Sequence, residues 1–239
     1  MPNWCVNQVD ISGDEVEVAK LVEFVKSDDS AFTFENIVPP PTTPMYSSEA
    51  SHNKYVCGCQ SESAPDPENE GLFIWVIDGK KVGFGEKCPA HNEPSFGDHP
   101  DNWYHWNINN WGTKWSAAEV WHDRTDDGSG VDGTTSYNFD TAWAPAEPVI
   151  AALAEKFPTL RIAHRYCEGG MGYAGEVLYA DGEEIRREEY NLDSNDLPDS
   201  AWLKDENGEP MYGERDYDKV PMSSMERFCD EHFGGVVGG

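Results

Sequence analysis

Three cysteines and one histidine are the residues of this chain whose types and spacing point most directly to chemistry. Cys57-Gly58-Cys59 and Cys88-Pro89-Ala90-His91 form two short pairs, a C-x-C and a C-x2-H. Structural zinc is held by four thiolate or imidazole ligands in a tetrahedron, which two such pairs can supply. The first spacing is tighter than the usual C-x2-C, so unligated thiols and a surface histidine remain the alternative. Zinc, if bound by all four side chains, would be structural, because no coordination position is left open.

A catalytic zinc is a second use of the same residues. It would need an open coordination position and a nearby general base, such as Glu86 or Glu93. The chain has no serine nucleophile elbow, phosphate-binding loop or H-E-x-x-H pattern. We therefore expect a protein that is not an enzyme. A zinc-binding enzyme or accessory protein of unknown substrate is the alternative.

Two further patterns are better explained by structure than by ligands. Residues 170–175 match the letters of a dinucleotide-binding fingerprint, but a strand follows them instead of the required helix, so we expect a bulged hairpin turn. Trp103, Trp106, Trp111 and Trp115 could stack on bases or sugars, yet only Lys114 lies near them in sequence. We expect these tryptophans to pack inside the protein or to contact a protein partner. His164 is expected to be a hydrogen-bonded core residue.

The charge of the chain excludes one class of function. Its 239 residues include 45 Asp and Glu against 17 Lys and Arg, a formal charge of −28. A charge of this sign opposes any broad grip on a nucleic-acid backbone, so direct DNA or RNA binding is not expected. Every fifty-residue block carries an excess of acids, which indicates a folded acidic surface rather than an acidic tail. The alternative is an acidic surface that serves only solubility.

The same charge suggests what the protein could imitate. Duplex DNA carries one charge per about 1.7 Å, so 28 charges correspond to roughly 48 Å of duplex. A compact domain of this length has a diameter of about 45 Å. We therefore predict a DNA mimic whose partner is a host protein with a basic nucleic-acid-binding surface. The candidate partner-binding acids are Asp126, Asp127, Asp132, Glu183, Glu184, Glu188 and Glu189.

Hydrophobic periodicity supplies the elements that must position these residues. Alternation predicts strands over residues 3–11, 118–122, 135–139, 160–166 and 173–179. Spacings of three and four predict helices after Asp14 and from Pro148. Strand, helix, strand, strand, helix, strand is the order of an α+β, ferredoxin-like βαββαβ sandwich, here with an extra strand.

The remaining segments are polar. We predict a core over 1–187 interrupted by an insertion at 46–100, which contains the possible zinc knuckle, and an acidic extension over 188–239. Ser223 and Glu226 predict a capping box for a short C-terminal helix. No apolar stretch has the length of a membrane span, and the start lacks the features of a secretory signal. Six cysteines are too few for a disulfide scaffold, so reduced thiols in a soluble, cytoplasmic protein are expected.

Five segments, in the same order, carry a resemblance to a known family. They are residues 1–7, 34–39, 111–115, 139–145 and the stretch from Tyr166 to Gly175. The chain resembles the YubB-like ferredoxin-domain proteins over roughly residues 1–45 and 100–182. The resemblance implies a ferredoxin-like fold and an origin in phages or conjugative plasmids, and hence the host cytoplasm. It implies no catalytic residues. Together with the charge, it suggests an anti-defence protein that inhibits a host DNA- or RNA-binding defence protein.

Overall fold

The structure is a computed structural model, and it describes residues 3–43, 46, 55–60, 62–66, 68, 73–77, 79–82, 87–93, 95, 99–123, 133–191, 202–215, 222–235 and 237. The chain divides into two compact units. Unit 1 comprises residues 1–38 and 112–239, and unit 2 comprises residues 39–111. Each unit is considered by itself.

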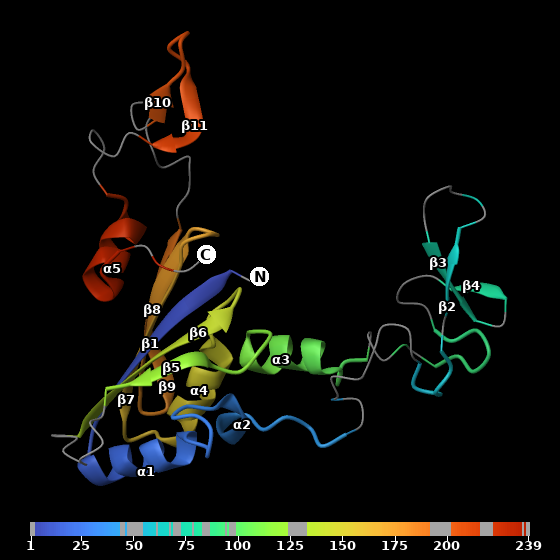
Figure 1. The fold of residues 1–239 in the computed structure, drawn as a ribbon. Coiled ribbons are helices and arrows are strands. Elements are labelled where there is room, and N and C mark those ends of the chain that lie inside the picture. Colours follow the sequence, from blue (N-terminus) through green and yellow to red (C-terminus); the bar gives the residue numbers. More distant parts are fainter. Residues whose placement is uncertain are drawn as a thin grey trace. The chain divides into compact units, whose positions relative to one another are not determined.

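Unit 1 is built on one antiparallel sheet of six strands (Figure 1). In spatial order the strands are β5 (Ala118–His122), β6 (Thr134–Ala142), β1 (Trp4–Ser12), β7 (Arg161–Glu168), β8 (Tyr173–Ala180) and β9 (Glu183–Asn191). The first four strands, with helices α1 (Glu15–Val25) and α4 (Glu147–Lys156), follow the βαββαβ order of a ferredoxin-like sandwich. The hairpin of β8 and β9 extends this sheet beyond β7. The predicted α+β, ferredoxin-like fold is confirmed.

Alternation along the central strand separates two faces of the sheet. Cys5, Asn7, Val9 and Ile11 of β1 are buried, whereas the residues between them are half-buried. Each buried residue lies opposite a buried partner on β6, as Asn7 lies opposite Phe139. We call the buried side the helix face and the other side the open face, because period-2 alternation sends successive side chains to opposite faces.

Both long helices of the sandwich start where the sequence predicts. The Asp14 carboxylate accepts hydrogen bonds from the backbone N–H groups of Val16 and Glu17 and so caps α1. Pro148 stands in the first turn of α4, where its missing N–H costs nothing. Their buried residues have the spacings of three and four that predict these helices: Val18, Leu21, Val22 and Val25 in α1, and Val149, Ile150, Leu153 and Ala154 in α4. The short helix α2 (Phe34–Ile37) adds Phe34 and Ile37 to the core.

Strand β9 differs from the expected organisation. It continues through residue 187, where the sequence suggests a boundary, to Asn191. Its residues are Glu, Arg and Tyr with only one aliphatic side chain, and most of them are exposed. An edge strand without a buried face has no apolar alternation, so periodicity does not reveal it.

The C-terminal part of unit 1 contains a hairpin and a helix. Strands β10 (Trp202–Lys204) and β11 (Pro210–Arg215) form the hairpin. Helix α5 (Ser224–Phe233) begins with the predicted capping box between Ser223 and Glu226. Its buried residues Met225, Phe228 and Cys229 pack against Cys167 and Ala174. Those two residues lie opposite each other on β7 and β8 and belong to the open face, so α5 covers one end of that face.

Unit 2 is small. Strands β2 (Glu62–Pro65), β3 (Phe73–Ile77) and β4 (Lys80–Val82) form a three-stranded antiparallel sheet, with Gly79 at a positive φ in the turn between β3 and β4. Helix α3 (Trp103–Trp111) was not predicted, because its Trp, Asn and His residues are weak helix formers. Trp111 is buried, and its ring meets that of Trp106 edge to face.

None of the helices in the described ranges is both long enough and apolar enough to cross a membrane.

Candidate metal centre and acidic surface

The four predicted metal ligands come together in unit 2. One donor atom from each of Cys57, Cys59, Cys88 and His91 lies within 4.8 Å of all the others. The Nδ1 atom of His91 is 3.3 Å from the Sγ of Cys59 and 3.7 Å from the Sγ of Cys88. Zinc–sulfur and zinc–nitrogen bonds of about 2.3 and 2.0 Å place neighbouring donors of a tetrahedron about 3.5 Å apart. The Cys3His cluster can therefore hold a metal ion.

A tight turn brings the first two cysteines to the same side. Gly58, between them, has a φ of +88°, a conformation that glycine adopts without steric cost. Its N–H donates to the carbonyl of Tyr55 at 2.7 Å, and the N–H of Tyr55 donates to the carbonyl of Cys59 at 3.0 Å. The glycine thus explains how a C-x-C pair, tighter than the common spacing, can present both thiols to one ion.

A second turn positions Cys88 and His91. The N–H of Asn92 donates to the carbonyl of Cys88 at 2.7 Å, and the N–H of Cys88 donates to the carbonyl of Glu93 at 2.6 Å. Asn92 has a φ of +60°, and asparagine is among the few residues that tolerate this region. An antiparallel bridge between Tyr55 and Ser95 joins the segments that carry the two turns.

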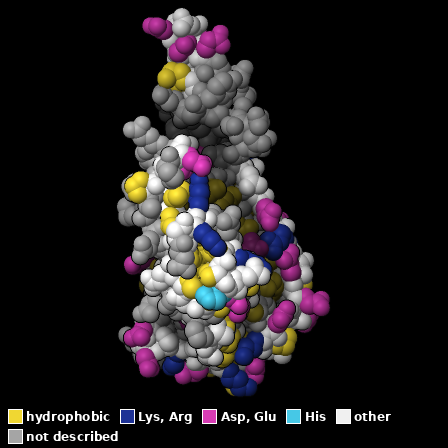
Figure 2. All heavy atoms as spheres, turned by 90° about the vertical axis from the view of Figure 1, so that its right-hand side faces the viewer, with side chains coloured by type: hydrophobic (Ala, Val, Ile, Leu, Met, Phe, Trp, Pro, Cys, Tyr) yellow, Lys and Arg dark blue, Asp and Glu magenta, His cyan; other side chains and the backbone are white. Residues whose placement is uncertain are grey.

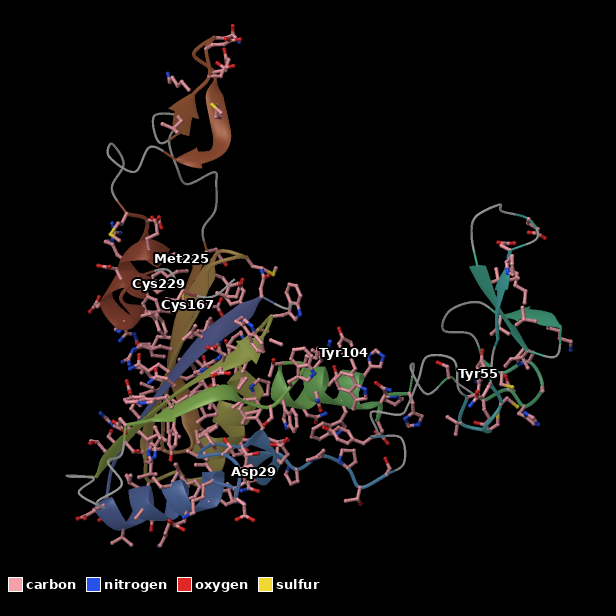
Figure 3. All side chains as sticks on the ribbon, viewed as in Figure 1. Asp29, Tyr55, Tyr104, Cys167, Met225 and Cys229 are labelled. Carbon is pink, nitrogen blue, oxygen red and sulfur yellow. The ribbon has the colours of Figure 1, made fainter. Side chains whose placement is uncertain are left out.

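An apolar cluster lies beside these ligands. Among the residues that the structure describes, Tyr55, Ile77, Val82 and Cys88 are its buried members, and Cys59 packs against them. Four buried side chains supply little of the free energy that ordering a polar segment requires. A bound metal stabilises such a segment by linking its two turns directly. Figure 3 shows Tyr55 among the sulfur-bearing side chains of this part of unit 2.

Two thiols of the cluster, those of Cys88 and Cys59, differ in acidity. Burial acts to raise the pKa of Cys88, but hydrogen bonds from the backbone of Ala90 and from His91 outweigh it and lower that pKa to about 7. The hydrogen bond with Cys57, together with burial, raises the pKa of Cys59 to about 11. A metal ligand must be the thiolate, so of these two thiols Cys88 loses its proton to a metal more readily than Cys59.

The predicted partner-binding acids fall into two groups. Asp126, Asp127 and Asp132 lie outside the described residues. Glu183, Glu184, Glu188 and Glu189 all lie on β9, where arginines accompany them. Arg187 pairs with Glu184, Glu189 and also Glu147 of α4, while Arg186 pairs with Glu188. These ion pairs hold the pKa values of Glu184 and Glu188 below their ordinary value. Three of the four glutamates are therefore partly neutralised.

A more acidic segment runs along α1. Residues 14–29 contain six acids and two lysines, Lys20 and Lys26. The lysines pair with Glu17 and Glu23. The remaining acids, Asp14, Glu15, Asp28 and Asp29, are exposed and have no cation partner among the ion pairs of the described residues. The predicted partner-binding acids do not include this segment, although its charge count is visible in the sequence alone.

The other singled-out residues serve structure. A strand, β8, follows residues 170–172, which confirms a hairpin turn in place of a dinucleotide site. His164 is fully buried, and its Nε2 lies 3.0 Å from the Oδ1 of Asn7. Its Nδ1 has no hydrogen-bond partner in the described structure, so the histidine is buried as expected but only half satisfied. Trp115 keeps 39% of its surface exposed and contacts Trp4 and Lys114.

Comparisons with known proteins gave one family-model match and one solved structure. No curated protein matches this chain. A solved crystal structure, that of a protein api92 from Yersinia pseudotuberculosis, is 12% identical to the chain with a TM-score of 0.43; the superposition covers 81% of this chain and 99% of that one. Residues 110–206, less than half of the chain, match the family model described as a ferredoxin-like domain in Api92-like protein. The segment that contains β5 to β10 is thus similar to the ferredoxin-like domain of Api92-like proteins.

Proposed function

We propose that this chain is an acidic binding protein that occupies the basic nucleic-acid-binding surface of a host DNA- or RNA-binding protein. In this proposal the protein acts in the host cytoplasm as a mobile-element product, and its partner is a defence enzyme. The observation that carries the proposal is the net charge of −28 on a chain with a ferredoxin-like sheet. A field of this sign attracts the surfaces that bind nucleic acid and repels nucleic acid itself.

The dispersed charge favours long-range attraction to a basic partner protein over a detailed imitation of the regular phosphate spacing of DNA. On the face shown in Figure 2 the Asp and Glu side chains (magenta) are dispersed, with Lys and Arg (dark blue) among them. This agrees with the even excess of acids along the sequence. A dispersed negative field speeds association with a basic partner, and this effect weakens as salt shortens the Debye length.

We place the main contact of unit 1 on residues 14–29 rather than on β9. Residues 14–29 have six acids and two lysines, an excess of four acids. Residues 183–189 have four glutamates and two arginines, an excess of two. Three of the four glutamates of β9 already have arginine partners, which a basic partner protein would have to displace. The exposed carboxylates of Glu15, Asp28 and Asp29 are available at no such cost.

The Cys3His cluster enters the proposal as a structural zinc site. Four protein ligands complete a tetrahedron, and each pair of ligands is presented by a hydrogen-bonded turn that packs on a small core. When bound, the metal holds the two turns together. The proposal assigns no catalytic step to it.

Capture from a bacterial lysate tests the binding function. The zinc-loaded full chain is immobilised, and bound proteins are eluted with duplex DNA or with salt. We expect nucleic-acid-binding proteins to elute with DNA, because both ligands compete for one surface. Recovery of proteins that DNA does not displace would count against the proposal.

Two matched variants test the contact surface. Glu15→Gln with Asp28→Asn and Asp29→Asn should slow association with a captured partner by about tenfold. The double variant Lys20→Gln with Lys26→Gln removes two positive charges from the same segment and so makes its net charge more negative. Association should be as fast as in the wild type or faster. Slowing by both variants would indicate a damaged helix, and slowing by neither would exclude this surface.

A further inference from the structure

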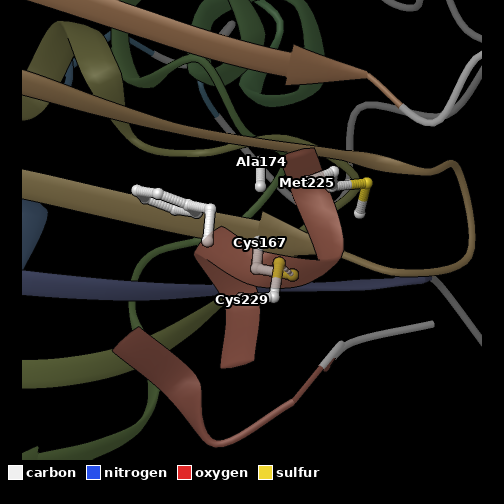
Figure 4. Packing of buried hydrophobic residues seen from close by; sticks show 5 residues of the cluster. Cys167, Ala174, Met225 and Cys229 are labelled. Carbon is white, nitrogen blue, oxygen red and sulfur yellow. Dashed lines mark hydrogen bonds between the residues drawn. The ribbon is translucent and has the colours of Figure 1, made fainter. Parts of the chain in front are cut away.

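A second group of cysteines lies in unit 1, far from the metal cluster in sequence. The Sγ atoms of Cys167 on β7 and Cys229 on α5 are 2.7 Å apart. Both side chains are completely buried. Figure 4 shows the two sulfurs side by side where α5 crosses the sheet, and Figure 3 shows the same residues within unit 1. Sixty-two positions separate the two residues in sequence, so the fold alone brings these thiols together.

The surroundings hold the pair in place. Ala174, Met225 and Phe228 pack around the two cysteines, and the ring of Tyr190 lies 4.9 Å from that of Phe228. After α5, the chain returns to β7, where the carbonyl of Val237 accepts a hydrogen bond from the N–H of Gly169 at 2.9 Å. The same carbonyl accepts from the thiol of Cys167 at 3.6 Å. Packing before and after Cys229 thus fixes its position relative to Cys167.

The two thiols are unequal. The hydrogen bond between them lowers the pKa of Cys167 and raises the pKa of Cys229. Either sulfur could be the donor in this contact. Cys167, with the lowered pKa, is the residue from which a thiolate forms more readily, and a thiolate is the nucleophile in disulfide exchange.

We infer that Cys167 and Cys229 are a redox modification site, at which a small-molecule disulfide converts the thiol pair into a bond that fastens α5 to β7. The sulfurs need to approach by only about 0.7 Å to reach a disulfide bond length of about 2.05 Å. Because both thiols are buried, the reaction occurs when α5 opens locally.

The reaction balances as two exchanges. The thiolate of Cys167 attacks one sulfur of the small disulfide, forms a mixed disulfide and releases one thiolate. Cys229 then loses its proton and attacks the sulfur of Cys167, which breaks the mixed disulfide and releases the second thiolate. The two protein thiols are oxidised by two electrons in total. The small disulfide is reduced to two thiols, which carry the two protons.

The other cysteines differ in ways that make the pair selective. Cys5 is buried, but its Sγ lies 3.9 Å from the carbonyl of Val6, and burial raises its pKa. Cys57, Cys59 and Cys88 belong to the metal cluster of unit 2. Zinc ligation would hold those three as thiolates that are not free to exchange.

Peptide mapping of the zinc-loaded full chain tests the inference. The protein is equilibrated with oxidised and reduced glutathione, its free thiols are alkylated, and it is digested without reduction. We expect one cross-linked peptide pair that joins Cys167 to Cys229, with Cys5 recovered alkylated. Recovery of both Cys167 and Cys229 as alkylated thiols under oxidising conditions would overturn the inference, as would cross-links spread over all cysteines.

Variants and hydrogen exchange add controls. Cys229→Ala should abolish the cross-link and leave Cys167 alkylated, whereas Cys5→Ser should form the cross-link as the wild type does. If Cys229→Ala fails to fold, the wild-type chain still provides a test. In the oxidised form, the amides of α5 should exchange at least tenfold more slowly than in the reduced form, and equal exchange rates would contradict the fastening of α5.

Discussion

Four donor side chains that lie close together in unit 2 predict that the chain binds zinc. We expect the purified chain to contain about one zinc ion, and Cys59→Ser or His91→Ala to lose most of it, since a structural site needs all four ligands. Acidification should release the metal, because protons compete for thiolate and imidazole. Elemental analysis of the dialysed proteins measures this.

Cys5→Ser is the matched control for these variants. It removes a buried cysteine of unit 1 whose sulfur is not part of the cluster. Its zinc content should equal that of the wild type. Zinc retained by both cluster variants would refute the assigned ligand set.

The burial of His164 predicts that unit 1 loses folding stability at low pH. Its complete burial, with a smaller effect of the Arg187 charge, lowers its pKa from the ordinary 6.5 to about 3. A group whose pKa falls on folding stabilises the folded state above its unfolded pKa, and this stabilisation is lost as the pH falls from about 6.5 towards 3. The loss is on the order of 5 kcal/mol for a shift of this size.

His164→Gln tests the assignment. Glutamine can still donate to the Oδ1 of Asn7, but it does not titrate. Urea unfolding at pH 7 and pH 4 should show a smaller loss of stability for the variant than for the wild type. An equal loss in both proteins would place the acid sensitivity elsewhere.

At the scale of elements, α5 depends on its first turn. Ser223 accepts a hydrogen bond from the N–H of Glu226 at 3.1 Å, and the Glu226 carboxylate accepts one from the N–H of Ser223 at 2.6 Å. Ser223→Ala should destabilise α5 by about 1 kcal/mol, seen as faster amide exchange in residues 225–233. Ser224→Ala, one position later, should have little effect. Equal effects of both variants would contradict the cap.

Several of the elements that the sequence revealed have one buried face. β1, β6 and β7 alternate because the helix face of the sheet is apolar, and α1 and α4 have apolar stripes because they cover it. β9 has no buried face and α3 has weak helix formers, so local pattern could not identify either one. The metal ligands were predictable because they occur in short pairs. The contact between Cys167 and Cys229 could not be predicted from a sequence pattern, because it depends on where α5 packs on the sheet.

At the scale of the whole molecule, the division into two units predicts separate responses to metal removal. A chelator should increase proteolysis and amide exchange in residues 55–95, where the metal would link the two turns that carry its ligands. The sheet of unit 1 has its own core and should keep its exchange protection in β1, β6 and β7. Hydrogen-exchange mass spectrometry before and after chelation measures both parts. Loss of protection throughout the chain would show that the units fold as one.

The charge of −28 is a property of the whole molecule. The proposed competition with nucleic acid for a basic protein surface rests on this charge. The most direct measurement titrates the zinc-loaded chain into a preformed complex of a captured partner with labelled duplex DNA and follows fluorescence anisotropy at several salt concentrations. We predict complete release of the DNA at each salt concentration, with a midpoint that rises with the DNA concentration because both ligands compete for one surface. DNA that stays bound while the chain binds the same partner would contradict the claim.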